Sequence, residues 1–422
     1  MNKYKFINDI ISDKKVLILG YGKEGKSTYN ILRKLNSCSI LAIADKNPIE
    51  TDNKVNHIGD DYLEYINDYD IVFKSPGIAL YQKEYNAIIT SQTEVFFSEY
   101  HKQIIGVTAT KGKSTTTSLI YQILKNQKLD VLLGGNIGIP FFDLINDLKE
   151  DSIIVSEVAC HQLENIKVSP HIAVILNIYE DHLDHYLSFD HYKQAKLNIT
   201  RYQNESDYLF ISDDLKEDMS FTKASIIKVT KDNIEEEIIN NFNKSNLKGN
   251  HNLSNAAIAY NVSKLFNIKI DSFINTLLSF KPLEHRIQYV ITKNNISYYD
   301  DSISTTAEST IAAINSIDNL ETIILGGLDR GIHYEKLVEA LNKSNLKNII
   351  LTYKSGKRIY ELMSTSNKNV YYFDELKEAI VKASEITSEN KSCILSPAAA
   401  SYGYFKNFIE RGNYYQKIIN EI

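Results

Sequence analysis

The chain has 422 residues, of which 43% are hydrophobic and 24% are charged, and its formal net charge is −6. This length favours two to four domains of about 100–200 residues, and the negative charge excludes a general attraction to nucleic acid or anionic lipid. The three cysteines lack metal-ligand spacing, and no run approaches the roughly 18 apolar residues that span a bilayer. We therefore expect a cytoplasmic protein with neither a nucleic-acid partner nor a membrane segment.

Along the chain, short apolar runs alternate with longer segments of helical period, which predicts an α/β fold built from parallel sheets. The first unit is predicted to span residues 1–93, with strands at 15–20, 39–45 and 69–77. The turn after its first strand, Gly20 to Gly25, fits the G-x-G-x-x-G pattern of dinucleotide-binding enzymes. Asp45 ends the second strand, near the place where those enzymes bind a ribose. These features alone are consistent with an NAD-dependent dehydrogenase, although such glycines also serve tight packing.

The second unit is predicted to span residues 94–282, with strands at 103–110, 152–159, 171–177 and 208–212 and a long helix at 250–266. Between its first strand and the following helix lies the sequence Gly112-Lys113-Ser114. In such a loop, backbone N–H groups and the lysine bind phosphate oxygens, and the hydroxyl ligates Mg²⁺. Five residues separate Gly106 from Gly112, one more than in the P-loop pattern. The segment therefore predicts a nucleotide site with a lengthened turn.

Carboxylate, imidazole and amide groups follow the later strands of this unit. Glu157 ends an apolar strand, where a carboxylate either ligates Mg²⁺ or is solvated. The segment 181–185, Asp-His-Leu-Asp-His, combines two types of metal ligand, and a solvated loop is the alternative interpretation. Asn252 and Asn255 are three residues apart and so share one helix face. Helix capping explains one of these amides, and binding of an adenine edge and its phosphates explains both.

The third unit is predicted to span residues 283–422. It begins after the segment 279–285, which carries Pro282, and opens with a hairpin at 287–302 whose turn is Lys293-Asn294-Asn295. Further strands are predicted at 322–327, 348–353 and 392–397, with helices between them.

Several motifs then occur in one order across all three units: TATKGKSTT (108–116), SEVACHQLE (156–164), NIYEDHLD (177–184), AKL (195–197), GNHNLSN (249–255), DDSISTTAEST (300–310), GGLDRG (326–331) and SPAAASYGYFKNFIERG (396–412). In these motifs the chain resembles the Mur ligase family, whose ATP loop carries the same extra residue. The chain departs from the family pattern at Ala109, Ala159, Cys160 and Ile303. The resemblance implies three domains: an N-terminal Rossmann-like unit, a central P-loop ATPase-like mononucleotide-binding domain and a C-terminal Rossmann-like domain.

The resemblance implies that ATP is bound by Thr110, Lys111, Gly112, Lys113, Ser114, Thr115, Asn252, Asn255, Arg286 and Asp301. It implies two Mg²⁺ ions, with ligands from Ser114, Glu157, His182 and Lys196. It further implies that CO₂ carbamylates Lys196, which converts a cation into an anionic group able to act on Mg²⁺. The catalytic residues implied in this way are Lys113, His182 and Lys196.

The two other substrates also have implied sites. A uridine-nucleotide substrate is expected at Gly22, Lys23, Glu24, Asp45, Ser75, Pro76, Gly77 and Asn136. An incoming amino acid is expected at Thr305, Arg330, Ser401 and Phe408. The planar guanidinium of Arg330 suits bidentate binding of a carboxylate. Ile303 stands where the family usually has lysine, so one positive charge is missing near this site.

The activity implied by the resemblance is ATP-dependent addition of D-glutamate to UDP-N-acetylmuramoyl-L-alanine, through an acyl-phosphate, in peptidoglycan synthesis. A cytoplasmic monomer is expected. A related subgroup adds L-glutamate, and this alternative stays open because the chain departs from the family pattern at Ile303 and within 156–164 and 398–405.

Three other functions are weighed against this one. A folylpolyglutamate synthase shares the ATP loop and the modified lysine, but it normally lacks a separate N-terminal uridine-nucleotide unit. A dehydrogenase uses only the first glycine-rich turn and leaves the Gly-Lys-Ser loop without a role. A non-enzymatic P-loop module needs no amino-acid pocket.

Overall fold

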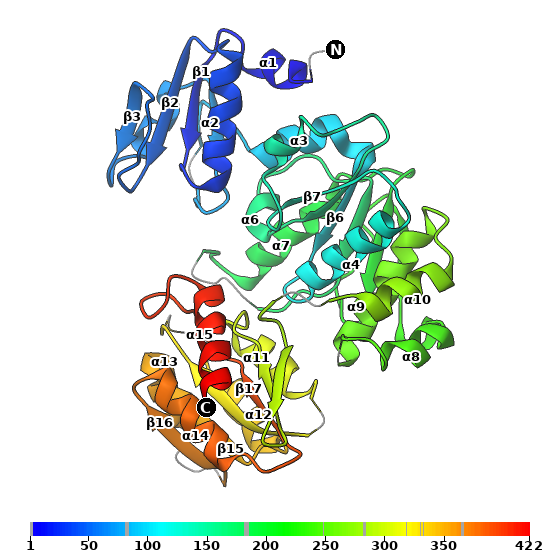
Figure 1. Cartoon of the computed structure of the whole chain (residues 1–422). Coiled ribbons are helices and arrows are strands. Elements are labelled where there is room, and N and C mark those ends of the chain that lie inside the picture. Colours follow the sequence, from blue (N-terminus) through cyan, green and yellow to red (C-terminus); the bar gives the residue numbers. More distant parts are fainter. Residues whose placement is uncertain are drawn as a thin grey trace. The chain divides into compact units, whose positions relative to one another are not determined.

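The computed structural model describes residues 3–80, 84–180, 185–247, 249–281, 284–317, 319–329, 331, 333–363 and 367–422, apart from the side chains of Lys231 and Glu308. Its contacts divide the chain into two compact units, which we call unit 1 (Met1–Glu235 and Ser254–Thr276) and unit 2 (Glu236–Leu253 and Leu277–Ile422). Both are α/β structures with mainly parallel sheets (Figure 1), as the sequence predicts. None of the helices in these described ranges is long and apolar enough to cross a membrane.

The first sheet of unit 1 is five-stranded and parallel, with the order β3-β2-β1-β4-β5. Its strands are β1 (Lys15–Leu19), β2 (Ile40–Asp45), β3 (Val55–Ile58), β4 (Ile71–Lys74) and β5 (Ile88–Thr90). The helices of this part are α1 (Lys5–Ile11), α2 (Lys23–Leu35), η1 (Glu64–Asp68), α3 (Gln92–Tyr100) and η2 (His101–Gln103). Because the strands are parallel, the glycine-rich turn after β1 and the segment after β4 emerge at the same sheet edge.

The second sheet of unit 1 is six-stranded and parallel, with the order β11-β10-β9-β6-β8-β7. Its strands are β6 (Ile104–Thr108), β7 (Val131–Gly135), β8 (Ile153–Glu157), β9 (Ile172–Ile175), β10 (Tyr208–Ser212) and β11 (Ser225–Val229). The helices of this part are α4 (Lys113–Asn126), α5 (Phe141–Leu144), α6 (Cys160–Leu163), α7 (Phe189–Arg201) and η3 (Lys231–Asn233). Helices α9 (Asn250–Lys264) and α10 (Ile270–Ser279) each contribute residues to both units.

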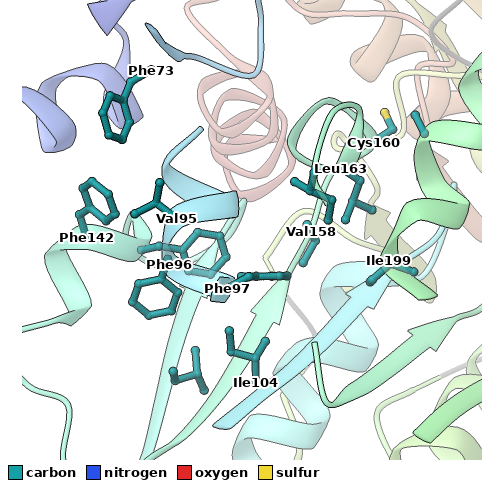
Figure 2. Close-up of a cluster of buried hydrophobic side chains, with 14 of the residues drawn as sticks. Phe73, Val95, Phe96, Phe97, Ile104, Phe142, Val158, Cys160, Leu163 and Ile199 are labelled. Atoms are coloured by element: carbon teal, nitrogen blue, oxygen red, sulfur yellow. The ribbon is translucent and has the colours of Figure 1, made fainter. Parts of the chain in front are cut away.

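One hydrophobic cluster joins the two parts of unit 1 (Figure 2). Phe96 of α3 is completely buried, and its ring stacks on Phe141 of α5 with centroids 5.0 Å apart. Phe73 of β4 meets Phe142 of α5 edge-on at 6.3 Å. Aromatic burial of this kind contributes several kcal/mol per ring, so the two sheets of unit 1 share a single packed core.

Unit 2 contains a six-stranded sheet with the order β12-β13-β17-β14-β15-β16, antiparallel only between β12 and β13. Its strands are β12 (Gln288–Lys293), β13 (Ile296–Asp300), β14 (Leu320–Gly326), β15 (Asn348–Thr352), β16 (Asn369–Phe373) and β17 (Ser392–Leu395). Its helices are α8 (Glu236–Phe242), α11 (Ala307–Ile314), α12 (Glu335–Lys343), α13 (Tyr353–Leu362), α14 (Leu376–Ile386) and α15 (Phe408–Glu421). The predicted hairpin is confirmed: Asn294 and Asn295 join β12 to β13 with φ of 52° and 59°, values that asparagine tolerates.

Five strands have no counterpart in the sequence-based prediction, namely β3, β5, β7, β11 and β16. All five lie at sheet edges. Edge strands are covered on fewer sides, and polar residues interrupt β3 and β11, unlike central strands such as β4 and β9. The predicted boundary at Pro282 lies outside the described residues.

Replacing Phe96 with alanine should lower the free energy of unfolding by about 3–5 kcal/mol, because a fully buried ring is lost from the shared core. The matched control is Ile88→Ala, since Ile88 is 66% exposed, and it should change stability by less than about 0.5 kcal/mol. Urea unfolding followed by far-ultraviolet circular dichroism measures both. Equal stability losses in the two variants would contradict the shared core.

Candidate active site

The Gly-Lys-Ser loop connects β6 to α4 and is held in shape by Asn177, which follows β9. The Asn177 side chain accepts from the backbone N–H of Lys111 at 2.9 Å and donates to the Lys111 carbonyl at 3.0 Å. The Thr110 N–H donates to the Asn177 backbone carbonyl at 2.9 Å. The Thr110 hydroxyl accepts from the Tyr179 N–H at 2.9 Å and lies 2.9 Å from the Tyr192 hydroxyl, so this side chain also helps to hold the loop. The loop is therefore ordered by the protein itself.

Gly112 is the position where this loop requires glycine. Its φ is +89°, and a Cβ there would lie 2.9 Å from the Asn255 amide nitrogen and 3.0 Å from Leu176. Asn255 of α9 thus packs directly against the start of α4. The backbone at Ala109, by contrast, does not have a positive φ. The departure from the family's glycine at Ala109 therefore causes no left-handed strain.

Two lysine amines meet at one backbone oxygen. Lys113 Nζ donates to the Ala109 carbonyl at 2.8 Å, and Lys196 Nζ of α7 donates to the same oxygen at 2.8 Å. The two nitrogens are consequently at most twice that distance apart. Two full positive charges about 5–6 Å apart repel by roughly 3 kcal/mol at an effective dielectric constant of about 20. Lys196 is also only 1% exposed, so water screens this repulsion poorly.

Glu157 lies at the end of β8, beside β6 in the sheet. Its Oε1 accepts from Asn136 Nδ2 at 2.5 Å, while its Oε2 is buried and has no hydrogen-bond partner in the described part of the chain. Leaving a carboxylate oxygen buried and unpaired is costly. A hard cation such as Mg²⁺ prefers carboxylate and hydroxyl oxygens, so Glu157, with Ser114 in the first turn of α4, fits a magnesium site.

Two predicted site residues fall outside the structure's described ranges. His182, a predicted metal ligand, is one of them, together with Asp181 and Asp184 of the same segment. Arg330, predicted to bind an amino-acid carboxylate, is the other.

A cavity of about 480 Å³ in unit 1 opens beside the glycine-rich turn after β1. All eight residues predicted to bind a uridine nucleotide line it: Gly22, Lys23, Glu24, Asp45, Ser75, Pro76, Gly77 and Asn136. Asp45 is fixed there because its two carboxylate oxygens accept the backbone N–H groups of Tyr21 at 2.7 Å and Asn47 at 2.8 Å. Asn136 also donates to Glu157, so this one residue connects the cavity to the carboxylate at the end of β8.

Glu24 gives this cavity an unusual carboxyl group. Burial raises the pKa of Glu24 to about 7, although a hydrogen bond from Gln162 opposes the shift. Gln162 Nε2 donates to Glu24 Oε1 at 2.6 Å, and Oε2 is buried without a hydrogen-bond partner among the described residues. The neutral acid can donate a hydrogen bond that a carboxylate cannot.

A buried ion pair supports the far wall of the same cavity, and sequence reasoning missed it. Lys74, the last residue of β4, lies 3.2 Å from Glu164, and both side chains are about 5% exposed or less. Lys74 also donates to the carbonyl of Ile78 at 2.6 Å, which closes the Ser75-Pro76-Gly77 turn. Burial lowers the pKa of Lys74, while attraction to Glu164 raises it. Lys74 ends an otherwise apolar strand, so the local sequence predicts a β-strand and does not indicate an ion pair.

In unit 2, Asp301 follows β13 and is completely buried by its neighbours. Its carboxylate accepts from the Ser396 hydroxyl at 2.7 Å and from the Ile287 N–H at 3.2 Å. Burial raises the pKa of Asp301 to about 6, and the nearby Arg286 charge opposes that shift. The Arg286 Nε atom is buried without a partner in the ranges that the structure describes. These two predicted ATP-binding residues are thus brought together within unit 2, which also contains Asn252.

Arg411, which the sequence analysis assigned no role, links the segments that carry the predicted amino-acid site. Its guanidinium donates to the Ser302 carbonyl at 2.8 Å and to the Ala399 carbonyl at 3.0 Å. The Ser302 hydroxyl donates to the Phe408 carbonyl at 2.8 Å. The segments bearing Thr305, Ser401 and Phe408 are therefore held together by one buried cation, which is 1% exposed. The only sequence signal for Arg411 is the Arg-Gly pair that ends the motif at 396–412, and the sequence analysis gave this pair no function.

Comparisons with known families match two parts of the chain. The Mur ligase middle domain matches residues 107–263, and the Mur ligase glutamate ligase domain matches residues 285–399. The UDP-N-acetylmuramoylalanine–D-glutamate ligase of Oenococcus oeni is 33% identical over 437 residues, covering 96% of this chain and 97% of the relative. The enzyme of the same name from Clostridium tetani is 31% identical over 462 residues and covers both chains completely.

Solved structures show the same fold. The MurF ligase of Thermotoga maritima in complex with ADP aligns with a TM-score of 0.62 at 15% identity, covering 98% of this chain and 97% of that one. The UDP-N-acetylmuramate-alanine ligase MurC of Thermotoga maritima aligns with a TM-score of 0.59 at 17% identity, covering 97% and 99%. At these identities the similarity establishes architecture alone.

Replacing Gly112 with alanine should weaken ATP binding about tenfold or more, because the new Cβ would displace the Asn255 amide and strain a left-handed residue. Gly22→Ala is the matched control, since Gly22 also precedes a helix but a Cβ there meets no atom within 4 Å. Isothermal titration with ATP and Mg²⁺ measures the difference. Unchanged affinity in the Gly112 variant would show that the loop does not contact the nucleotide.

The raised pKa of Glu24 predicts a specific pH dependence of stability. In the unfolded chain this group titrates near 4.5, and in the folded chain near 7. The folded state therefore binds more protons between these values, and its stability falls as pH rises from about 4.5 to about 7, by up to about 3 kcal/mol. Glu24→Gln should remove this slope, whereas Glu64→Gln, at an exposed position, should keep it. Urea unfolding at pH 4.5, 5.5, 6.5 and 7.5 tests this, and parallel pH profiles for wild type and Glu24→Gln would refute it.

Proposed function

The chain belongs to the Mur ligase family, and we propose that it uses ATP to join D-glutamate to UDP-N-acetylmuramoyl-L-alanine, a step of peptidoglycan synthesis. Relatives that match this chain over nearly their whole length are named for this activity. The observation that carries the proposal is the convergence of Lys113 and Lys196 on the Ala109 carbonyl, which places two basic side chains beside the phosphate loop. ATP phosphates and a carboxylate substrate supply the opposite charge.

We infer three functional parts from the three sheets. Residues 1–93 hold the uridine-nucleotide substrate in the cavity beside the glycine-rich turn. Residues 94–282 bind ATP through the Gly-Lys-Ser loop and Asn255. Residues 283–422 supply Arg286 and Asp301 to ATP, and Thr305, Arg330, Ser401 and Phe408 to glutamate. The protein is proposed to act as a cytoplasmic monomer.

Magnesium is the metal that suits this donor set. Ser114 and Glu157 would hold one ion, and His182 with the modified Lys196 would hold a second. When bound, Mg²⁺ offsets negative charge on the transferring phosphoryl group. The unpaired Oε2 of Glu157 is the feature of this chain that best supports such a site.

We propose that Lys196 carries a carbamate derived from CO₂. The resemblance to the Mur ligase family implies this modification, and Lys196 is buried and donates to the same carbonyl as Lys113 of the phosphate loop. An uncharged amine adds to CO₂ and releases one proton, leaving a negative carbamate. The modification thereby replaces repulsion between two cations with attraction between Lys113 and an anion.

The reaction then proceeds in two steps. The alanyl carboxylate attacks the γ-phosphorus of ATP, whose bond to the bridging oxygen breaks to release ADP. The glutamate amine attacks the resulting acyl-phosphate carbon, loses a proton and expels phosphate to leave an amide. Lys113 offsets charge on the phosphoryl group in the first step. Arg330, Thr305, Ser401 and Phe408 orient the amine for the second step.

Phosphate release from ATP tests the substrate assignment. With UDP-N-acetylmuramoyl-L-alanine, release should require D-glutamate and should fail with L-glutamate or L-lysine. Release that is faster with L-glutamate would replace the proposed amino acid, while release independent of any amino acid would remove the ligase proposal.

Replacing Lys196 with alanine should abolish ligation, and excess formate or acetate should restore part of it by returning a carboxylate to the cavity. Lys193→Ala is the matched control on the same helix, since Lys193 pairs with Asp190 and Glu217 and makes no contact with Ala109. Its rate should stay within about twofold of wild type, because surface ion pairs contribute little. Full activity of Lys196→Ala without added carboxylate would contradict the carbamate.

A further inference from the structure

Three side chains with metal-binding chemistry lie at the edge of the central sheet that is opposite the Gly-Lys-Ser loop. His101 precedes β6, His171 directly precedes β9, and Asp207 directly precedes β10. These strands are neighbours in the order β10-β9-β6 and run parallel, so their starting residues lie side by side. The Gly-Lys-Ser loop follows the other end of β6. The cluster is therefore separate from the proposed active site.

The distances within the cluster are short. His101 Nε2 lies 3.1 Å from Asp207 Oδ1, and His171 Nδ1 lies 2.8 Å from the same oxygen. The ligand atoms of all three residues lie within 4.8 Å of one another. Asp207 is completely buried, whereas His101 and His171 are 24% and 28% exposed, so the carboxylate is covered by two imidazoles that reach solvent.

The partners outside the cluster orient each donor atom. His101 Nδ1 lies 2.6 Å from the Ser169 carbonyl, which accepts only, so this nitrogen carries the proton. The remaining nitrogen, Nε2, faces the Asp207 carboxylate, another acceptor. Asp207 Oδ2 accepts from the Asn204 N–H at 2.8 Å, which leaves Oδ1 directed at the imidazoles. His101 Nε2 and His171 Nδ1 therefore both face Asp207 Oδ1, so two imidazole nitrogens and one carboxylate oxygen converge.

We propose that His101, His171 and Asp207 bind a zinc-class divalent cation. Two imidazole nitrogens and one carboxylate oxygen are donors that suit Zn²⁺, with water as the fourth ligand. In a tetrahedral site with bonds of about 2.0–2.1 Å, donor atoms are about 3.3 Å apart, so the two imidazole–carboxylate spacings of 3.1 and 2.8 Å need to widen by only a few tenths of an ångström. The His101–Ser169 hydrogen bond is the arrangement in which a ligating histidine donates its other N–H to a carbonyl.

The surroundings allow such an ion to enter. His171 also lines a cavity of about 490 Å³, together with Lys102, Gln103 and Tyr208, which offers space for a water ligand. An ion there would link the starts of three adjacent strands, β6, β9 and β10. The nucleotide loop follows the other end of β6. The role of the ion is structural, and the proposal does not depend on the substrate of the enzyme.

The test counts zinc bound to the full-length protein. The chain is stripped with a chelator, dialysed with a small excess of Zn²⁺ and saturating Mg²⁺, which keeps the proposed magnesium site filled, and analysed by atomic emission. Wild type should retain one more zinc per chain than His171→Gln, whose affinity at this site should fall by more than about 100-fold. His333→Gln is the matched control, because His333 is 91% exposed. It should retain as much zinc as wild type.

Thermal unfolding provides a second measurement. Zn²⁺ should raise the midpoint of wild type and of His333→Gln, but should not raise that of His171→Gln. Wild-type protein that retains no zinc overturns the proposal whatever the variants do. Equal zinc content in wild type and a folded His171→Gln variant overturns it as well.

Discussion

The Ala109 carbonyl accepts hydrogen bonds from both Lys113 and Lys196, and this shared oxygen fixes the electrostatics of the proposed active site. A single lysine on a phosphate loop needs only the nucleotide to balance its charge. A second lysine, Lys196 of α7, is buried and donates to the same carbonyl oxygen, so two basic side chains meet at the start of the phosphate loop. Glu157, whose Oε2 is buried and unpaired within the described residues, adds an anionic group that is incompletely satisfied. The protein thus presents opposite charges whose balance depends on what binds between them.

The cavity beside the glycine-rich turn uses buried charge differently. Burial raises the pKa of Glu24 to about 7, so much of this group keeps its proton near neutral pH, while Lys74 and Glu164 form a buried pair behind the Ser75-Pro76-Gly77 turn. A neutral acid can donate a hydrogen bond to a phosphate or sugar oxygen, and a closed ion pair keeps the adjacent turn in place without offering a free charge. Binding and support are therefore carried by different ionisable groups. Gln162 connects the two parts of unit 1 because it reaches Glu24 from α6.

Much of this architecture follows from the sequence, and the exceptions have physical reasons. Central strands such as β6 and β9 are predicted because burial on both faces demands continuous apolar residues, whereas edge strands such as β3 and β11 carry polar residues that hide their period. The residues around the unit 1 cavity are predicted from the resemblance to the Mur ligase family, and the cavity that they line lies beside the glycine-rich turn after β1. Lys74 and Arg411 are missed because their roles depend on partners far away in the chain, namely Glu164 and Ser302. No local pattern encodes such long-range pairs.

The contact between Asn177 and the loop has a consequence for how ATP associates. Two side-chain hydrogen bonds to Lys111 and one backbone bond from Thr110 give the loop its shape before any nucleotide arrives. The conformational entropy of this segment is thus lost during folding, so binding of the nucleotide does not have to order the loop. Nucleotide affinity then reflects mainly the charges that meet in the loop. A loop whose shape is fixed before binding also favours ligands with one spacing of phosphates. Selectivity among polyphosphates is then set by the conformation of the unbound protein.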